Sequence, residues 1–221
     1  MAYHAASSRG GGAIMATRPE FWSRMAERYS RSKIPNEEIY ERKLRETQEY
    51  LTPESEVLEI GCGTGTTAIR HGPHARHILA TDYAEGMLEI ARKKAEEAGV
   101  TNVTFERASA EEIDEGRGPF DMVMAHSILH LVGDRPAVLA KCARLLKPGG
   151  VFVSSTFTPG RWHPLRFVLP LPGLFGFVPE VGFFSEADLV AEVEEAGLHV
   201  ERRWKPSRMS ALFLIARKQG T

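Results

Sequence analysis

A glycine-rich loop that directly follows a short apolar run constrains the fold of this chain most strongly. The run 57–60 has the composition of a buried strand, and it leads into the loop 61–65 (GCGTG), after which a helix is expected. Glycines at alternate positions let the backbone turn sharply and approach a ligand closely, because they carry no Cβ. The N-terminus of the next helix offers unpaired N–H groups. The pattern predicts a strand–loop–helix unit that binds a ligand through its backbone.

Strand-like and helix-like segments alternate along most of the chain. The predicted strands are 57–60, 78–81, 103–105, 121–125, 151–156, 199–204 and 211–216. The predicted helices are 20–30, 36–50 with Asn36 as N-cap, 66–71, 86–98, 135–146 and 186–196. This order predicts an α/β fold, a doubly wound, seven-stranded, mostly parallel sheet whose last strand is antiparallel.

The domain organisation follows from the same alternation. We expect a flexible Ser- and Gly-rich leader over residues 1–16 and one domain over residues 17–221. Within that domain, residues 17–52 form N-terminal helices, and residues 158–184 form an irregular cap rich in Pro, Gly and aromatic residues. No segment has the roughly 20 apolar residues that crossing a bilayer requires.

Asp82 gives the glycine loop a more specific meaning. It ends the second predicted strand, where one carboxylate can bind two ribose hydroxyl groups. The dinucleotide spacing G-x-G-x-x-G is absent, because Thr66 stands at the position of its last glycine. No Tyr-x-x-x-Lys pair is present either, so a nicotinamide oxidoreductase is disfavoured.

Four ordered motifs carry a resemblance to a known family. They are VLEIGCGTG at 57–65, Asp82 followed by Tyr83, Met87 and Leu88, FDMV at 120–123 with Leu129 and His130, and LLKPGG at 145–150. The chain resembles the class I S-adenosylmethionine-dependent methyltransferases, in the small-molecule branch that includes quinone and lipid methyltransferases. The resemblance covers roughly residues 20–216 and implies a Rossmann-like methyltransferase fold.

The resemblance also implies a cofactor, S-adenosyl-L-methionine, which leaves as S-adenosyl-L-homocysteine. Glu59 would anchor the loop and the amine of the cofactor, Asp82 would hold the ribose, and Tyr83 or Met87 would cover the adenine. Ser109 replaces the acidic residue that the family often places before Ala110, so either Ser109 or Glu111 would accept from the adenine amino group. The full set of expected cofactor contacts is Glu59, Gly61, Cys62, Gly63, Gly65, Asp82, Tyr83, Met87, Ser109, Ala110, Ala125 and Tyr29.

Two histidines follow the fourth predicted strand, where the acceptor sits in this fold. His126 and His130 are four residues apart and would share a face if the segment were helical. Histidine has an unperturbed pKa suited to removing a proton from an acceptor hydroxyl group. One of them is therefore a candidate catalytic base, and the alternative is that His130 only packs against the pocket.

Three further features allow alternatives. His71, His74 and His77 invite a metal site, but a helix break between them and the lack of other ligands favour loop histidines and no metal. A stripe of Trp22, Met25 and Tyr29 forms either a lid over the cofactor or plain packing. The apolar segment 161–178 forms a lipophilic wall over the acceptor, a patch in peripheral contact with a membrane, or a cap that packs on the domain.

Composition excludes several classes of function. There are 28 Lys and Arg against 29 Asp and Glu, so no basic surplus favours a nucleic-acid partner. Two cysteines supply neither a disulfide framework nor a thiolate metal cage, and they fit a reducing, cytoplasmic location. We expect a methyltransferase that transfers a methyl group by in-line displacement to a small lipophilic acceptor, a quinone, an aromatic or a lipid-like metabolite. A cofactor-binding protein without catalysis, or an enzyme for a phospholipid head group, remains an alternative, and the sequence leaves the oligomeric state open.

Overall fold

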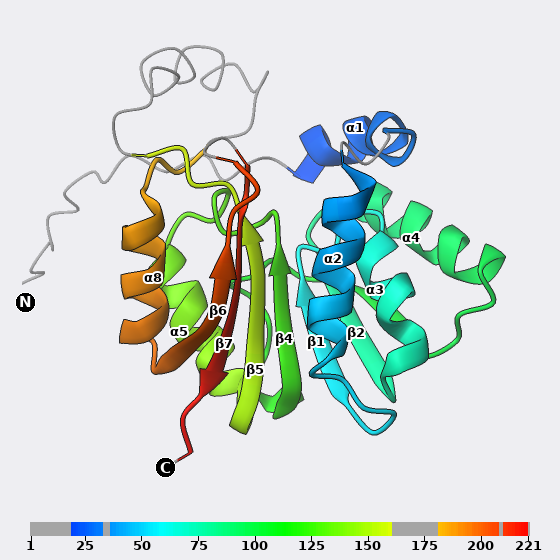
Figure 1. Ribbon diagram of the computed structural model, residues 1–221. Coiled ribbons are helices and arrows are strands. Elements are labelled where there is room, and N and C mark those ends of the chain that lie inside the picture. Colours follow the sequence, from blue (N-terminus) through cyan, green and yellow to red (C-terminus); the bar gives the residue numbers. More distant parts are fainter. Residues whose placement is uncertain (1–18, 33–35, 161–180, 208–209, 221) are drawn as a thin grey trace, which may run out of the picture.

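One sheet organises the chain, in a computed structural model that describes residues 19–32, 36–160, 181–207 and 210–220. The strands of these described residues lie in the order β3-β2-β1-β4-β5-β7-β6 (Figure 1). Their bounds are β1 Glu56–Ile60, β2 His77–Asp82, β3 Val103–Arg107, β4 Phe120–His126, β5 Leu146–Thr156, β6 Leu198–Trp204 and β7 Leu212–Lys218. The first five strands pair in parallel, and β7 is antiparallel to both β5 and β6. The predicted doubly wound, seven-stranded sheet with an antiparallel last strand is confirmed.

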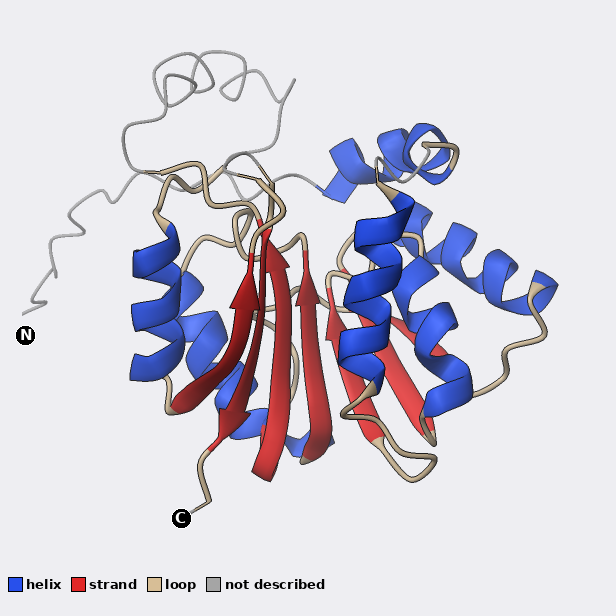
Figure 2. Cartoon of the chain, viewed as in Figure 1, coloured by secondary structure: helices blue, strands red, loops and turns tan. Residues whose placement is uncertain are grey.

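Helices cover both faces of the sheet (Figure 2). Their bounds are α1 Pro19–Ser30, α2 Glu37–Gln48, α3 Thr66–His71, α4 Glu85–Glu97, α5 Arg135–Leu145 and α8 Glu186–Glu195. One face packs against α5 and α8, the other against α3 and α4, with α2 beside α3 (Figure 1). The helix α1 packs against α4, where Ala26 meets Met87.

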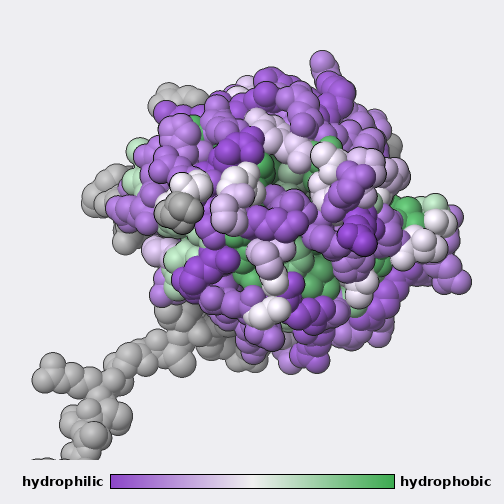
Figure 3. Space-filling model, turned by 90° about the horizontal axis from the view of Figure 1, so that it is seen from below, coloured by the Kyte–Doolittle hydropathy of each residue, from purple (hydrophilic) through white to green (hydrophobic). Residues whose placement is uncertain are grey.

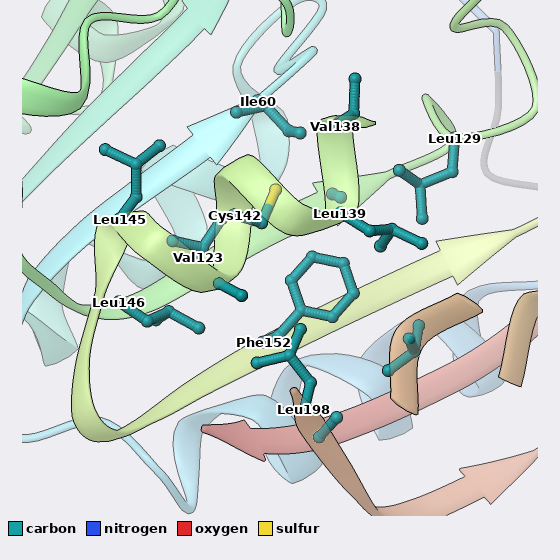
Figure 4. Packing of buried hydrophobic residues seen from close by; sticks show 14 of the residues in the cluster. Ile60, Val123, Leu129, Val138, Leu139, Cys142, Leu145, Leu146, Phe152 and Leu198 are labelled. Carbon is teal, nitrogen blue, oxygen red and sulfur yellow. The ribbon is translucent and has the colours of Figure 1, made fainter. Parts of the chain in front are cut away.

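The alternation of side chains along each strand divides the core into two layers. On β1, Val57 belongs to the layer under α3 and α4, whereas Leu58 belongs to the layer under α5 and α8. Phe152 of β5 is fully buried in the second layer, close to Val123 and Leu139 (Figure 4). The continuous burial of β1, β2 and β4 fits parallel strands that are covered on both faces.

Local signals explain where several helices begin. The side chain of Asn36 accepts a 3.0 Å hydrogen bond from the amide of Ile39, which confirms Asn36 as N-cap of α2. Ser185 and Asp188 form a capping box at the start of α8.

The predicted turn before the fifth strand is placed differently. Residues 147–150 belong to β5 itself, which starts at Leu146 opposite Phe120 and regains its register at Val151 opposite Met122. The extra residues form a bulge, and Gly149 adopts a positive φ of 75° there.

Two predicted segments lie outside the described residues. These are the leader over residues 1–16 and the apolar segment 161–178. Within the described residues, no helix is long and apolar enough to cross a membrane. The face seen from below, opposite the carboxyl ends of the parallel strands, is mostly hydrophilic (Figure 3).

Candidate active site

A cavity of about 910 Å³ lies at the carboxyl ends of the parallel strands. This edge of an open α/β sheet is where ligands generally bind. Because the strand order is β2-β1-β4-β5, the cavity has one end at β1 and β2 and another at β4 and β5. The first end is lined by Glu59, Gly61, Cys62, Gly63, Asp82, Tyr83 and Met87, and the second by His126, His130, Leu131, Ser155 and Phe157.

The glycine loop after β1 adopts a backbone that side chains would strain. Gly61, Gly63 and Gly65 have φ values of 65°, 54° and 72°. A Cβ on Gly65 would lie 2.7 Å from the Phe105 ring, and one on Gly61 would lie 2.8 Å from Ile128. A Cβ on Gly63 would meet only Tyr29, at 3.9 Å. Packing therefore demands glycine at positions 61 and 65, whereas Gly63 leaves open space for a ligand.

Asp82 is held rigidly at the end of β2. Its Oδ2 accepts a 2.9 Å hydrogen bond from the amide of Gly63, and its Oδ1 accepts one of 2.9 Å from the amide of Ala84. Burial raises the pKa of this carboxyl group, and the backbone hydrogen bonds oppose the rise. Each carboxylate oxygen can accept a further hydrogen bond, so Asp82 can receive hydroxyl groups from the cavity.

Glu59 lies buried beneath the loop, with only 2% of its surface exposed. Its Oε2 has no hydrogen-bond partner among the described residues. Burial raises the pKa of Glu59 to about 8, a hydrogen bond from the Ala68 backbone lowers it, and the charge of Asp82 raises it further. A ligand amine here would supply the missing partner and a favourable charge.

The helix α1 borders the same end of the cavity. The Trp22 and Tyr29 rings pack edge-on with centroids 6.4 Å apart, and both line the cavity. Burial raises the pKa of Tyr29, as do the charges of Asp82 and Glu59, although half of the residue is exposed. Ala26 of the same helix packs against Met87, so α1 both packs on the domain and borders the cavity.

The two candidate histidines line the other end of the cavity. His126 ends β4, and Ser127 then takes a φ of 56°, so the segment to His130 is a turn and the condition of a helical segment is not met. Burial lowers the pKa of both to about 4, and the charge of Lys43 adds to the effect at His126. Nε2 of His126 and Nδ1 of His130 have no partner among the described residues. Both rings are therefore neutral at pH 7, and both residues line the cavity.

Sequence reasoning missed the contribution of α2. Tyr40, Lys43 and Thr47 all line the cavity, and Lys43 Nζ donates a 2.7 Å hydrogen bond to Ser155 Oγ. Tyr40 OH lies 3.3 Å from Thr67 Oγ1. The spacing of three and four residues along one helix face was the available signal, since it places these polar side chains together.

Four predicted cofactor contacts do not line the cavity. Gly65 caps α3 and packs against Phe105. Ala125 and Ala110 lie in the core layer under α5, and the amide of Ser109 bonds to Glu112. The roles proposed for these four residues stay predictions.

The loop interpretation of the three clustered histidines is wrong for two of them. His71 ends α3 and is fully buried, with neither ring nitrogen bonded to a described residue, and His77 begins β2. Burial lowers the pKa of His71 to about 3. No group of His, Cys, Asp or Glu among the described residues is arranged to hold a metal ion.

Comparison with known proteins shows a methyltransferase domain in the chain. Residues 57–150 match the family model described as "Methyltransferase domain". The chain is 30% identical over 161 residues to the ubiquinone biosynthesis O-methyltransferase of Hahella chejuensis, which is 72% of this chain and 60% of that relative. These matches support a class I S-adenosylmethionine-dependent methyltransferase. The match spans about three fifths of the relative's length.

Solved structures agree with this methyltransferase fold. The YcgJ protein of Bacillus subtilis superposes with a TM-score of 0.67 at 20% identity, covering 82% of this chain and all of that one. An S-adenosylmethionine-dependent methyltransferase of Mesorhizobium loti superposes with a TM-score of 0.66 at 22% identity, covering 79% and 95%. At this identity the likeness concerns the fold.

The cavity of this methyltransferase fits the cofactor of its family, S-adenosylmethionine. The open space at Gly63 allows a close approach to the loop, and the unpartnered Oε2 of Glu59 can accept from an amine. The carboxylate of Asp82 can accept from two hydroxyl groups. The cofactor carries all three kinds of group: an amino acid, an amine and a ribose.

Proposed function

We propose that this methyltransferase methylates a hydroxyl group of a small lipophilic acceptor, a quinone precursor or a related aromatic metabolite. The observation that carries the proposal is the shape of the cavity, which joins a cofactor-binding end at β1 and β2 to a second end at β4 and β5. The second end combines neutral histidines with apolar side chains. The relative named ubiquinone biosynthesis O-methyltransferase supports an oxygen acceptor.

The residues at the first end would bind and orient the cofactor. Asp82 would accept hydrogen bonds from the ribose, Glu59 from the amine, and the Gly63 backbone would pass close to the amino-acid part. When bound, S-adenosylmethionine supplies an electrophilic methyl group on a sulfonium, and the product is S-adenosylhomocysteine. Methyl transfer is an in-line displacement, so the main tasks of the protein are orientation and exclusion of water.

The second end would orient the acceptor. We assign the contact with its hydroxyl group to His126, whose Nε2 has no described partner. Apolar side chains that line the same cavity would hold a ring or a chain, among them Ile39, Leu131 and Phe157. Because α1 and α2 also line this cavity, we include residues from 17 onward in the methyltransferase domain.

With a pKa of about 4, His126 is almost entirely deprotonated at pH 7 and accepts a proton only weakly. His126 is therefore a poor base in the ligand-free protein, although an anion bound beside it would raise its pKa. Ionising an acceptor hydroxyl group at neutral pH requires further stabilisation of the negative oxygen.

The proposal is tested with S-adenosylmethionine labelled in its methyl group. Purified protein is incubated with the label and a bacterial extract, which is then split into organic and aqueous fractions. Label in the organic fraction, lost in Asp82→Ala, is the expected result. Labelled product confined to the aqueous fraction, once separated from unreacted cofactor, would overturn the lipophilic acceptor, and absence of labelled product from both fractions would overturn methyl transfer to any acceptor in that extract.

A further inference from the structure

Lys43 places a positive charge in the cavity without a described counter-ion. It lies on α2, partly buried, and Nζ donates one hydrogen bond, of 2.7 Å, to Ser155 Oγ. In the described part of the chain, no carboxylate pairs with Lys43 and the other two N–H donors of its ammonium group have no partner. Burial lowers the pKa of Lys43. A buried cation without a partner costs free energy and is typical of a functional site.

Two further groups converge on the same point. Ser155 and His126 are register partners on the neighbouring strands β5 and β4. Their side chains point to the face that α2 covers, because they alternate with residues of the opposite core layer. Because Lys43 is hydrogen-bonded to Ser155, its ammonium group lies beside the strand pair that carries His126, and its charge lowers the pKa of His126.

The polarity of this cluster selects a ligand. Lys43 offers two free N–H donors, Ser155 can donate its hydroxyl hydrogen, and His126 can donate from Nε2 in the matching tautomer. Donors converging on one point bind an anionic oxygen and disfavour an amine or a sulfonium.

The other titratable groups that line the cavity near this cluster leave its charge positive. Glu59 on β1, with a pKa of about 8, is mostly protonated at pH 7. His71 on α3 is neutral, with a pKa of about 3, and His130, after β4, is neutral with a pKa of about 4. Tyr40 on α2 is neutral too, since burial raises its pKa above the usual value. Lys43 therefore sets the electrostatic potential at this end.

We propose that Lys43, Ser155 and His126 form a subsite that binds the acceptor oxygen as a phenolate. The inference rests on the proposed function and names its acceptor class, an aromatic ring with an ionisable hydroxyl group. The O–H bond breaks with its electron pair kept on oxygen, and the proton passes to bulk water. That pair would then form the new O–CH3 bond as the bond between the methyl group and the sulfonium sulfur breaks, with its electron pair left on the sulfur of S-adenosylhomocysteine. A phenol is favoured over a carboxylic acid, because a carboxylic acid is already ionised at pH 7 and needs no such help.

The test uses 4-nitrocatechol, whose absorbance reports its ionisation, with S-adenosylhomocysteine present. In the unsubstituted protein, binding should lower the pKa of the probe. Lys43→Met should weaken binding of the ionised probe by about tenfold to a hundredfold, the range of a charge-assisted hydrogen bond. Lys43→Arg should keep part of the effect, and Ser155→Ala should show a smaller loss. Arg45→Met removes a charge from an exposed position of the same helix and should change nothing.

The outcomes separate this inference from the proposed function, because probe binding needs no methyl transfer. Equal probe ionisation in the unsubstituted protein and in a folded Lys43→Met would overturn the subsite, even if labelled acceptor still forms. Tighter binding of 4-nitrobenzoate than of 4-nitrocatechol would overturn the phenol assignment. If Lys43→Met fails to fold, as judged by thermal unfolding, Lys43→Gln and Ser155→Ala provide the same comparison.

Discussion

The amide of Gly63 donates a 2.9 Å hydrogen bond to Oδ2 of Asp82, 19 positions further along the chain. The bond ties the loop after β1 to the end of β2, so the backbone that faces the cavity and the carboxylate that faces it are positioned together. One residue thus shapes the loop and offers acceptors to a ligand.

This double role predicts the behaviour of Asp82→Ala. The variant should lose most of its affinity for S-adenosylhomocysteine, measured by calorimetry. It should also lose about 1–3 kcal/mol in free energy of unfolding, because the amides of Gly63 and Ala84 are left without their acceptor. Asp82→Asn keeps one acceptor oxygen and should lose less of both. Affinity unchanged in Asp82→Ala would contradict the ribose assignment.

Substitutions of the loop glycines should distinguish a glycine that packing requires from one that ligand binding requires. Gly65→Ala brings a methyl group to 2.7 Å from the Phe105 ring and should destabilise the fold strongly. Gly63→Ala meets only Tyr29, so it should cost only the roughly 1–2 kcal/mol of its left-handed backbone. It should nonetheless weaken S-adenosylhomocysteine binding. Urea unfolding and calorimetry on both variants test this, and normal binding by Gly63→Ala would show that the ligand does not approach the loop there.

Glu59 should make the ligand-free protein less stable as pH rises. Its folded-state pKa of about 8 exceeds the usual value of 4.5, so between these pH values the unfolded chain has lost a proton that the folded chain keeps. Raising pH therefore favours unfolding across that window. His71, His126 and His130, with pKa values lowered to about 3, 4 and 4, oppose this trend until the histidines of the unfolded chain are deprotonated, about one pH unit above their usual pKa of 6.5.

The clean interval for the measurement is therefore about pH 7.5 to 8.5, where the histidines of the unfolded chain have lost their protons and Glu59 still titrates. Urea unfolding of the unsubstituted protein should show stability falling across it, and Glu59→Gln should flatten the slope. Parallel curves for the two proteins would rule out Glu59 as the source.

The attachment of α2 to the sheet should also be measurable. Trp204 Nε1 donates a 2.8 Å hydrogen bond to Glu46, and the Arg42 guanidinium lies 4.0 Å from the centre of the Trp204 ring. Trp204→Phe removes the donor and should cost about 1–2 kcal/mol in unfolding free energy. Since α2 also carries Lys43, this variant should weaken 4-nitrocatechol binding more than S-adenosylhomocysteine binding. Equal losses of both ligands would argue against separate ends of the cavity.

Much of the fold could be predicted from the sequence because its signals are local. Strand–helix alternation and the glycine loop determine the parallel part of the sheet, and Asn36 marks the start of α2. The bulge over residues 147–150 could not be predicted, since it depends on how β5 pairs with β4.

Only those site residues that lie at or near the ends of strands could be predicted from the sequence. Glu59, Asp82 and His126 each lie at or near the end of a strand, so their convergence follows from the parallel sheet. Lys43 depends on how α2 docks on the sheet, and the burial of His71 on how α3 packs, and neither contact has a local signature. The position of Ala125 in the motif does not show whether its side chain faces the cavity, as that of His126 does. Side chains alternate along β4, so Ala125 points into the core.

The position of β7 between β5 and β6 has a consequence for biosynthesis. Residues 198–204 reach the ribosome exit before residues 212–218, yet they pair with the sheet only through those later residues. Until the chain has been made to Lys218, β5 lacks its outer neighbour and β6 has no strand beside it. Between the synthesis of β5 and that of β7, the nascent chain therefore exposes the outer edge of β5, and a stop codon at position 212 would leave β6 detached and open to proteolysis.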